Sequence, residues 1–216
     1  FVAKGLKGGT IDISEKRVLQ SGSLDANVAS GGTINVQASD QILQTTLSNT
    51  TADGSSGPGG VITLQAGNTL FSSGTVSAQG NTGGTIHALG NNVVLAAANL
   101  NASGKTGGGT VLVGGDFQGK NPLITNAKTV NINPSTQIKA DAQISGNGGK
   151  AIVWSDDQTT FYGQISAKGG AQGGNGGQIE VSGKQDLVYG GVGDASAPLG
   201  AAGSLLLDPA NIVITI

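Results

Sequence analysis

The residues that could perform acid–base or metal chemistry are few in this 216-residue sequence. It contains one histidine, His87, one arginine, Arg17, and no cysteine. Asp156 and Asp157 form the only pair of adjacent carboxylates, whereas glycoside hydrolysis requires two carboxylates held about 5–10 Å apart across a substrate. Neighbouring residues at the end of a strand point in opposite directions, so we interpret this pair as part of a turn.

The potential metal ligands do not form a recognisable site either. One histidine without cysteine does not supply a zinc site, and we interpret His87 as an ordinary surface residue. Asp53 and Gly54 lie in a polar corner, residues 48–58, that lacks the alternating Asp/Asn pattern and the distal Glu of a calcium loop. The glycine-rich stretches lack the Gly-Lys-Ser/Thr ending of a phosphate loop. We therefore expect neither a metal nor a cofactor.

A short repeat must position these side chains. In each copy a glycine pair (Ala-Gly in the last) precedes strict alternation, and the residues at positions +2 and +4 from the second glycine are apolar. Period-two alternation predicts a strand with one buried face, and a repeat of about 25 residues predicts a solenoid. The eight copies begin at Gly8, Gly31, Gly59, Gly83, Gly108, Gly148, Gly176 and Ala202.

A later apolar residue predicts a third strand in each coil, and a middle apolar run, such as residues 93–95, predicts a second. The later residue follows the second glycine by 15 or 16 residues, except in the fifth coil, where the interval is 29. Apart from that insertion, length varies only in the corner after the third strand, as is typical of a solenoid. The third-strand residues are Leu24, Leu47, Val76, Leu100, Ile138, Ile165 and Val192.

The sequence therefore predicts an all-β fold over residues 1–216, a right-handed parallel β-helix (solenoid) of about eight coils with three short strands each. Because neighbouring coils lie ~4.8 Å apart, the coils would form a rod roughly 40 Å long. We expect the glycines to adopt positive φ or to occupy corners that a Cβ would obstruct. The opening residues 1–9 and the closing residues 212–216 read as parts of unfinished coils, which favours a single segment of a longer solenoid.

One outward-facing column of side chains changes from polar to apolar along the solenoid. In the fifth and sixth coils it is apolar and lies next to Trp154, and the fifth coil also carries the insertion, residues 116–127. Exposed apolar columns need a cover or a partner, so we expect the insertion to fold down as a flap. The column, at position +3, is Asp12, Asn35, Thr63, His87, Leu112, Ile152, Glu180 and Leu206. The candidate contact patch is Leu112, Phe117, Leu123, Ile124, Ile152 and Trp154.

Two alternatives remain open for this patch. The flap could bind a ligand, with Trp154 stacking on a sugar, or the apolar column could associate sideways with another copy of the chain. A catalytic site is less favoured, because Asp12, His87 and Glu180 in the same column are three coils apart, or roughly 14 Å.

Composition excludes several classes of protein. Aromatic residues make up 3% of the chain, and Cys and Met are absent, which suits a narrow core of stacked aliphatic residues and rules out a disulfide scaffold. The net charge is −2 and there is no basic run, so nucleic acid and anionic membranes are poor partners. No run of 18 apolar residues is present, so we expect no membrane insertion.

About half of the chain, from Val113 to Ile214, resembles exoproteins of the filamentous-haemagglutinin and high-molecular-weight adhesin type, which are secreted by the two-partner route. The resemblance rests on VGGDFQGKN at 113–121, ADAQISGNGGKAIVWSDDQTTFYGQISAKGGAQGGNGGQIEVSGK at 140–184 and GSLLLDPANIVI at 203–214. It implies a long β-helical fibre on the outer cell surface of a Gram-negative-type bacterium or cyanobacterium, or secreted from it. It also implies export by an outer-membrane two-partner-secretion transporter.

The favoured function is therefore structural. The resemblance implies an extracellular adhesin or filament that serves adhesion, aggregation or biofilm formation, with an unknown host-cell or matrix glycan or protein receptor. The amino-terminal secretion domain of the family is not evident, so we interpret the chain as shaft and not as an enzyme. A carbohydrate- or protein-binding module using the region between Phe117 and Trp154 is the alternative, and a β-helical polysaccharide-degrading enzyme is less favoured.

Overall fold

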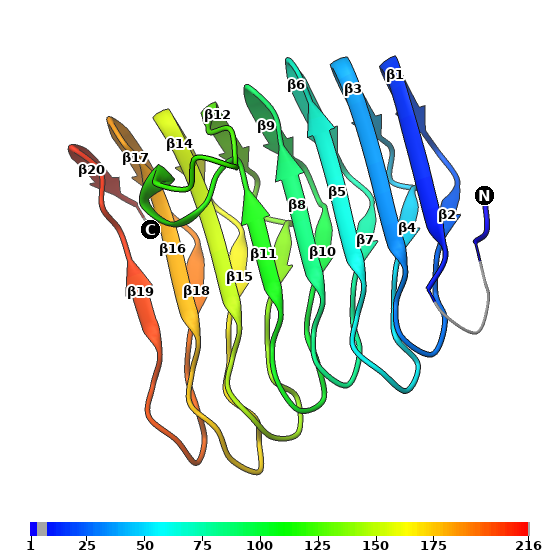
Figure 1. Cartoon of the computed structure of the whole chain (residues 1–216). Helices are drawn as coiled ribbons and strands as arrows, with labels where there is room; N and C mark the ends of the chain where they lie inside the picture. Colours follow the sequence, from blue (N-terminus) through cyan, green and yellow to red (C-terminus); the bar gives the residue numbers. More distant parts are fainter. Residues whose placement is uncertain (4–7, 216) are drawn as a thin grey trace.

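The computed structural model describes residues 1–3 and 8–215, and its coils lie side by side in one stack (Figure 1). Residues 4–7 of the opening stretch and Ile216 of the closing stretch, both expected in unfinished coils, lie outside the described residues. Every strand pairing within the described part is parallel, and the stack forms an all-β solenoid of about eight coils, as predicted.

The described strands form two sheets that run the length of the stack. The 13-stranded sheet contains β1 (Thr10–Gln20), β3 (Thr33–Gln44), β5 (Val61–Ala66), β6 (Thr69–Ser72), β8 (Thr85–Leu89), β9 (Asn92–Leu95), β11 (Thr110–Val113), β12 (Ala127–Ile132), β14 (Lys150–Phe161), β16 (Gln178–Gly183), β17 (Asp186–Tyr189), β19 (Ser204–Leu206) and β20 (Asn211–Ile214). The 7-stranded sheet contains β2 (Ser23–Asp25), β4 (Asn49–Thr51), β7 (Thr75–Ser77), β10 (Asn99–Asn101), β13 (Gln137–Lys139), β15 (Gln164–Ser166) and β18 (Val192–Asp194).

Each complete coil contains the three predicted strand segments, but they are not always three separate strands. In the first, second and sixth coils the first and second segments merge into one continuous strand, β1, β3 or β14. The register shifts where these long strands pass the corner, between Glu15 and Arg17 in β1. A shift of this kind bends a strand without ending it. The first two segments of each coil therefore belong to one bent sheet, and the third segment belongs to the other.

The repeat sets the register between coils and forms the core. Ile34, Ile62 and Ile86, at the same position of three successive coils, pair directly with one another and are fully buried. Each coil thus extends the same aliphatic ladder, which explains why so few aromatic residues are needed. Every buried methylene in such a ladder contributes about 0.8 kcal/mol relative to exposure. At the carboxyl end of the stack the ladder is open, because Leu205 is exposed.

Two of the expected third-strand residues do not lie in the buried ladder. Leu47 is 76% exposed, and Thr50 takes its place in the ladder, paired with Leu24 and Val76. Thr50 was missed because its buried side chain is polar and is satisfied internally, by Gln20 Nε2 at 3.0 Å from its Oγ1. Val192 lies in the third strand, β18, as predicted, but it is 62% exposed, and Gly193 is the residue that pairs with Ile165. Apolar character alone misplaced the register in both coils.

The glycine pairs are required by the close approach of neighbouring coils. A Cβ on Gly83 would lie 1.9 Å from the carbonyl oxygen of Ala102, and one on Gly84 would lie 2.1 Å from that of Gly60. Positive φ, which we also expected, occurs among the described glycines only at Gly114, Gly119, Gly146, Gly173 and Gly174. None of these belongs to a repeat pair, so the repeat pairs fulfil the second part of the expectation, close approach, and the five other glycines fulfil the first.

A constant hydrogen bond closes each corner between the third strand and the next coil. The N–H of the second glycine donates to an alanine carbonyl, as in Gly84 to Ala78 and Gly177 to Ala167, both at 2.7 Å. The two corners differ in length, yet the bond at their base is the same. Variation in length is therefore confined to residues outside this bond and does not disturb the core.

One interior column changes character along the stack. Gln20, Gln44 and Ser72 occupy it in the first three coils, where Gln44 Nε2 donates to Gln20 Oε1 and Ser72 Oγ donates to Gln44 Oε1, both at 2.8 Å. In later coils the column is apolar, and the Phe161 and Tyr189 rings stack with centroids 5.5 Å apart. Hydrogen bonds within the polar part satisfy groups that would be costly to bury alone.

Candidate functional site

The outward column at position +3 has the predicted register. Leu112 pairs with His87 on one side and Ile152 on the other, and Ile152 pairs with Glu180. The flap, residues 116–127, lies over this column as a green loop across β14 and β16 (Figure 1). The covered face is defined here as Leu112, Ile152, Trp154 and Glu180.

The flap begins with a tight turn. The Asp116 side chain accepts from the Phe117 N–H at 2.7 Å and caps the short helix η1 (Phe117–Gly119). Gln118 and Gly119 then adopt φ of 53° and 61°, a left-handed conformation that glycine adopts without strain. A Cβ on Gly119 would lie 2.4 Å from Trp154 Nε1. This glycine therefore permits both the turn and the close contact with the indole ring.

The flap packs its apolar residues onto the covered face. Phe117 and Ile124 are partly buried against Leu112, Ile152 and Trp154. The indole of Trp154 is only 4% exposed as a result. Leu123 does not take part, because it is 89% exposed.

Polar contacts tie the flap to three further coils. Asp116 forms an ion pair with Lys150 of the sixth coil. The N–H of Gln118 donates to Glu180 Oε2 of the seventh coil at 2.9 Å, and its side-chain amide donates to Asp208 of the eighth at 3.0 Å. A segment inserted in the fifth coil thus extends along the stack axis and connects that coil to the three coils that follow.

The Asp156–Asp157 pair lies in β14 and not in a turn, which corrects the expectation. Asp156 Oδ1 accepts from Trp154 Nε1 at 3.2 Å and from Asn126 Nδ2 at 3.0 Å, while Asp157 is exposed. Asn126 Nδ2 also donates to the Gly119 carbonyl at 3.1 Å. Asp156 therefore fixes the indole ring and the base of the flap, which is a structural role.

The sequence analysis placed Glu180 in the outward column but did not predict its burial. Its side chain is 0% exposed, Oε2 accepts from the flap, and Oε1 has no hydrogen-bond partner. Burial raises the pKa of this carboxyl, against the opposing effect of the Gln118 N–H. The available signal was its position between Ile152 and Leu206 in a column that had turned apolar.

His87 lies at the edge of the covered face. It is half-buried beside Leu112, so the expectation of an ordinary surface residue holds only in part. Burial lowers its pKa, and the nearby Asp116 carboxylate acts in the opposite direction. Within the described residues, no group of three or more His, Cys, Asp or Glu side chains is placed to hold a metal ion.

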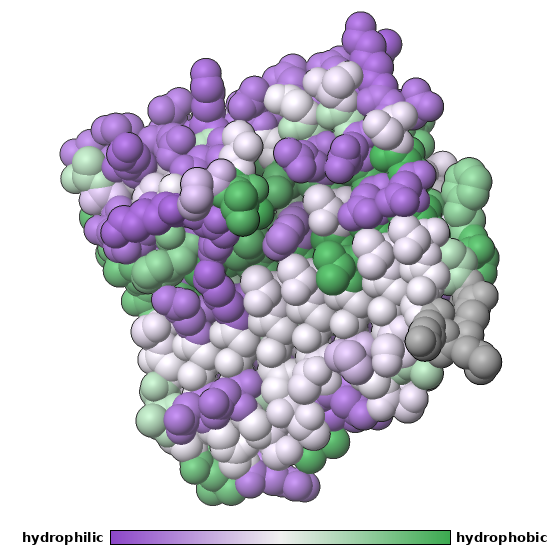
Figure 2. Space-filling view, viewed as in Figure 1, coloured by the Kyte–Doolittle hydropathy of each residue, from purple (hydrophilic) through white to green (hydrophobic). Residues whose placement is uncertain are grey.

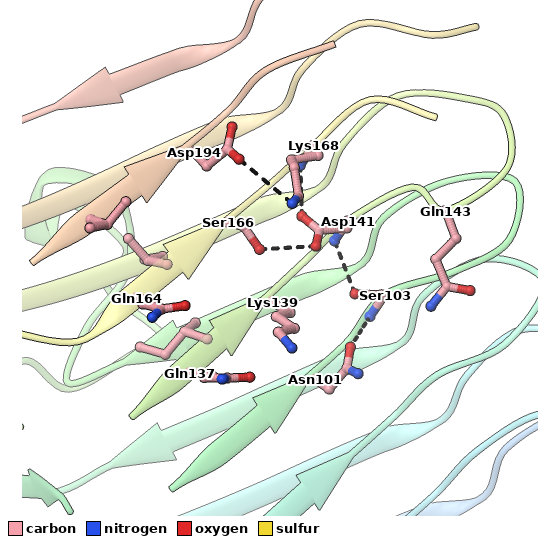
Figure 3. Close-up of a pocket in the computed structure, with 13 residues that line it drawn as sticks. Asn101, Ser103, Gln137, Lys139, Asp141, Gln143, Gln164, Ser166, Lys168 and Asp194 are labelled. Carbon is pink, nitrogen blue, oxygen red and sulfur yellow. Dashed lines mark hydrogen bonds and ion pairs between the residues drawn. The ribbon is translucent and has the colours of Figure 1, made fainter. Parts of the chain in front are cut away.

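A second candidate is a groove of about 440 Å³ on the outer side of the 7-stranded sheet (Figure 3). Polar side chains from successive coils project into it, and many bond to one another. Asp141 accepts from Ser166 Oγ at 2.9 Å and from the Lys168 N–H at 2.7 Å, and Lys168 Nζ lies 3.6 Å from Asp194. These bonds engage the groove's carboxylates structurally, and its two lysines balance its two aspartates in charge.

The outward face of the 13-stranded sheet offers no broad apolar surface in the part drawn in colour. Figure 2 shows apolar residues there as small separate areas among polar ones, with a pale band of intermediate hydropathy crossing the face. In the later coils the flap prevents a broad apolar surface, because it covers the apolar column that would otherwise be exposed. None of the described helices is long and apolar enough to span a bilayer.

Comparison with known proteins identifies the fold of this chain but not its family. No protein-family model and no curated protein matches this chain. Among solved structures, the crystal structure of the HMW1 secretion domain from Haemophilus influenzae matches with a TM-score of 0.58 and 24% sequence identity. The match covers 92% of this chain and 49% of that one, so this chain spans about half of the structure it resembles. At this identity the likeness establishes a shared β-solenoid fold.

Proposed function

We propose that this chain is a rigid shaft segment of a secreted or cell-surface bacterial adhesin or filament. The observation that carries the proposal is the continuous stack of parallel coils, in which each coil extends the same buried ladder. A solenoid of this kind forms a long, stiff rod. Each coil contacts only its neighbours, so the stability of the rod is distributed over all its coils.

The structural neighbour supports the cellular setting of the proposal. The solved structure is described as a secretion domain of HMW1, which agrees with the resemblance to two-partner-secreted adhesins. We accordingly propose an extracellular location on a Gram-negative-type bacterium, export by an outer-membrane two-partner-secretion transporter, and a role in adhesion, aggregation or biofilm formation. We propose no catalytic role, and the engagement of Asp116, Asp141 and Asp156 in structural contacts supports this choice.

Deletion of one whole coil from the full-length protein tests the shaft role. Removing residues 84–108 joins Gly83 to Gly109 and restores the repeat across the junction. We expect a secreted, folded protein whose solenoid is shorter by one spacing of ~4.8 Å in an electron cryomicroscopy reconstruction, with cell adherence retained.

The matched control is deletion of residues 84–95, which removes half a coil and destroys the register. It should prevent folding and secretion. Loss of adherence in the whole-coil deletion, with secretion and solenoid intact, would instead assign receptor binding to this segment.

A binding module remains the second candidate, carried by the one tryptophan of the covered face. Because Trp154 is buried beneath the flap, stacking on a sugar requires the flap to open. A glycan array should therefore give no signal with the native chain and none with Trp154→Ala. A glycan that binds the native chain and not this variant would favour the binding module over the shaft.

A third candidate, a role in secretion, follows from the printed description of the neighbour. The test is to co-express the full-length protein with its transporter, with and without residues 1–216. The shaft proposal expects secretion to persist when a separate secretion domain remains. Its complete loss, while the remaining protein stays folded in the periplasm, would move the assignment to a secretion domain.

A further inference from the structure

The covered face contains a buried carboxyl that the shaft role does not require. Glu180 is fully buried, and one of its oxygens has no hydrogen-bond partner among the described residues. Its other oxygen accepts from the backbone N–H of Gln118 at 2.9 Å. An ionised carboxylate in such a place is costly, because one hydrogen bond replaces only part of its hydration.

The charged groups around Glu180 do not neutralise it. Lys150 on the sixth coil is already paired with Asp116 of the flap, and Lys120 of the flap donates to the Gln118 side chain at 2.8 Å. Asp208 on the eighth coil has the same sign as Glu180 and disfavours a second negative charge nearby. Burial and the like charge of Asp208 raise the pKa of Glu180, and they outweigh Gln118, Ser182 and Lys150, which lower it. The neutral carboxylic acid is therefore the better buried form.

We propose that the flap is a proton-dependent latch, held down when Glu180 is protonated and loosened when Glu180 ionises. When the flap lifts, the Glu180 carboxylate gains water and loses only the Gln118 hydrogen bond. The same movement uncovers Trp154 and the apolar side chains of Leu112 and Ile152. The latch thus controls whether the apolar part of the outward column is available to another molecule.

The direction of the pH effect follows from linkage. Burial raises the pKa of Glu180 above its ordinary value of 4.5 when the flap is closed. Below pH 4.5 Glu180 is protonated whether the flap is open or closed, so closing the flap buries no charge. As pH rises from 4.5 to the raised pKa, the opening constant increases by up to about tenfold per pH unit, and above the raised pKa it is constant.

His87 would act in the opposite direction. Burial lowers its pKa from 6.5, so charging His87 at acid pH weakens the closed state. The two effects are separable by substitution, since His87 contacts the column from the fourth coil and Glu180 from the seventh.

Two readouts follow the latch directly. Gln118 is the flap residue whose backbone amide donates to Glu180, so hydrogen exchange at this amide reports opening. Trp154 is the sole tryptophan, so quenching of its fluorescence by acrylamide reports exposure of the covered face. Both are measured from about pH 4 to about pH 8, with exchange rates corrected for the intrinsic pH dependence of the chemistry.

Glu180→Gln should abolish the rise in opening with pH, because the amide cannot ionise. Asp208→Asn should end the rise at a lower pH and make it smaller, because it removes the like charge that faces Glu180. His87→Gln should leave the rise due to Glu180 in place. Far-UV circular dichroism verifies that each variant retains its strands.

Three outcomes would overturn the latch. They are opening that does not change with pH in the native chain, a rise that persists in Glu180→Gln, and a rise in Asp208→Asn that is as large as in the native chain and ends at the same pH. The last measurement keeps the proposal open to refutation if Glu180→Gln does not fold.

Discussion

Coils one to four and coils five to eight share one backbone register but bury different side chains. In the first four coils the outward column is polar and needs no cover, whereas at Leu112 and Ile152 it is apolar and lies under the flap. The interior column changes one coil earlier, from the hydrogen-bonded Gln44 and Ser72 to Leu95. The backbone ladder thus tolerates either kind of side chain, provided that buried polar groups find partners and apolar surface is covered.

The largest expected effect tests what the two halves share. Gly84→Ala in the fourth coil and Gly149→Ala in the sixth should each lower the free energy of unfolding by about 4 kcal/mol or more. The added Cβ would lie 2.1 Å and 2.0 Å from a backbone carbonyl oxygen of the preceding coil, respectively. Urea denaturation followed by circular dichroism measures both. Gly22→Ala is the control, since nothing lies within 4 Å of its Cβ. Markedly unequal losses would show that the coils are not packed alike.

The next effect separates the covered half from the uncovered half. Trp154→Ala should cost about 3 kcal/mol, because it removes the largest side chain beneath the flap. Gln65→Ala, at the same outward position two coils before the flap, should change stability by less than about 0.5 kcal/mol, because Gln65 is exposed. Thermal unfolding of the two variants makes the comparison. Similar losses in both would mean that the flap does not stabilise the later coils.

The third effect compares the polar and apolar parts of the interior column. Gln44→Leu should cost about 2 kcal/mol, because it leaves the buried Ser72 hydroxyl and Gln20 amide short of partners. Ile132→Val, in the apolar part of the same column, should cost about 1 kcal/mol. Denaturant unfolding at one protein concentration ranks them. A stabilising Gln44→Leu would show that the polar ladder is dispensable for stability.

The smallest effect concerns the flap's ion pair. Lys150→Met should cost about 1 kcal/mol or less near neutral pH, because the Lys150 side chain is 32% exposed and water screens the pair. Burial would raise the pKa of Asp116, but hydrogen bonds from Lys150, Asn121 and the Phe117 N–H lower it overall. The pair's contribution is therefore full above pH 3.8 and is lost as pH falls through the lowered value.

Thermal unfolding of the native chain and Lys150→Met, from about pH 7 to about pH 2, follows this loss. Asp12→Asn is the matched change in the uncovered half, where the carboxylate accepts only from Asn35 at 2.7 Å among the recorded bonds. It should alter stability by less than about 0.5 kcal/mol. A Lys150→Met penalty that is unchanged at acid pH would rule out the ion pair as its source.

The fold was predictable because the period-two pattern and the glycine pairs carry the packing directly. The register of the outward column, from Asp12 to Leu206, agrees with the pairing at every coil. The third strand was less predictable, since Thr50 and Gly193 occupy buried or paired positions without an apolar side chain. Their identity depends on hydrogen bonds and close contacts that a hydrophobicity pattern does not record.

The covered face was predictable only in outline. The apolar column indicated that a cover was needed, and Phe117 and Ile124 lie there. The exposure of Leu123 depends on the turn made by Gln118 and Gly119, whose left-handed backbone conformation no pattern specified. The burial of Glu180 likewise depends on where that turn places the Gln118 N–H.

The hydrogen bond from each second glycine to an alanine carbonyl has a consequence for evolution and for engineering. Because that bond closes the corner at its base, corners of different length are accommodated without disturbing the core. Successive corners lie along one edge of the stack, so variable segments would be displayed in a row at intervals of ~4.8 Å. The solenoid therefore presents its variable corners in a row at a fixed spacing, a geometry suited to carrying inserted peptide segments.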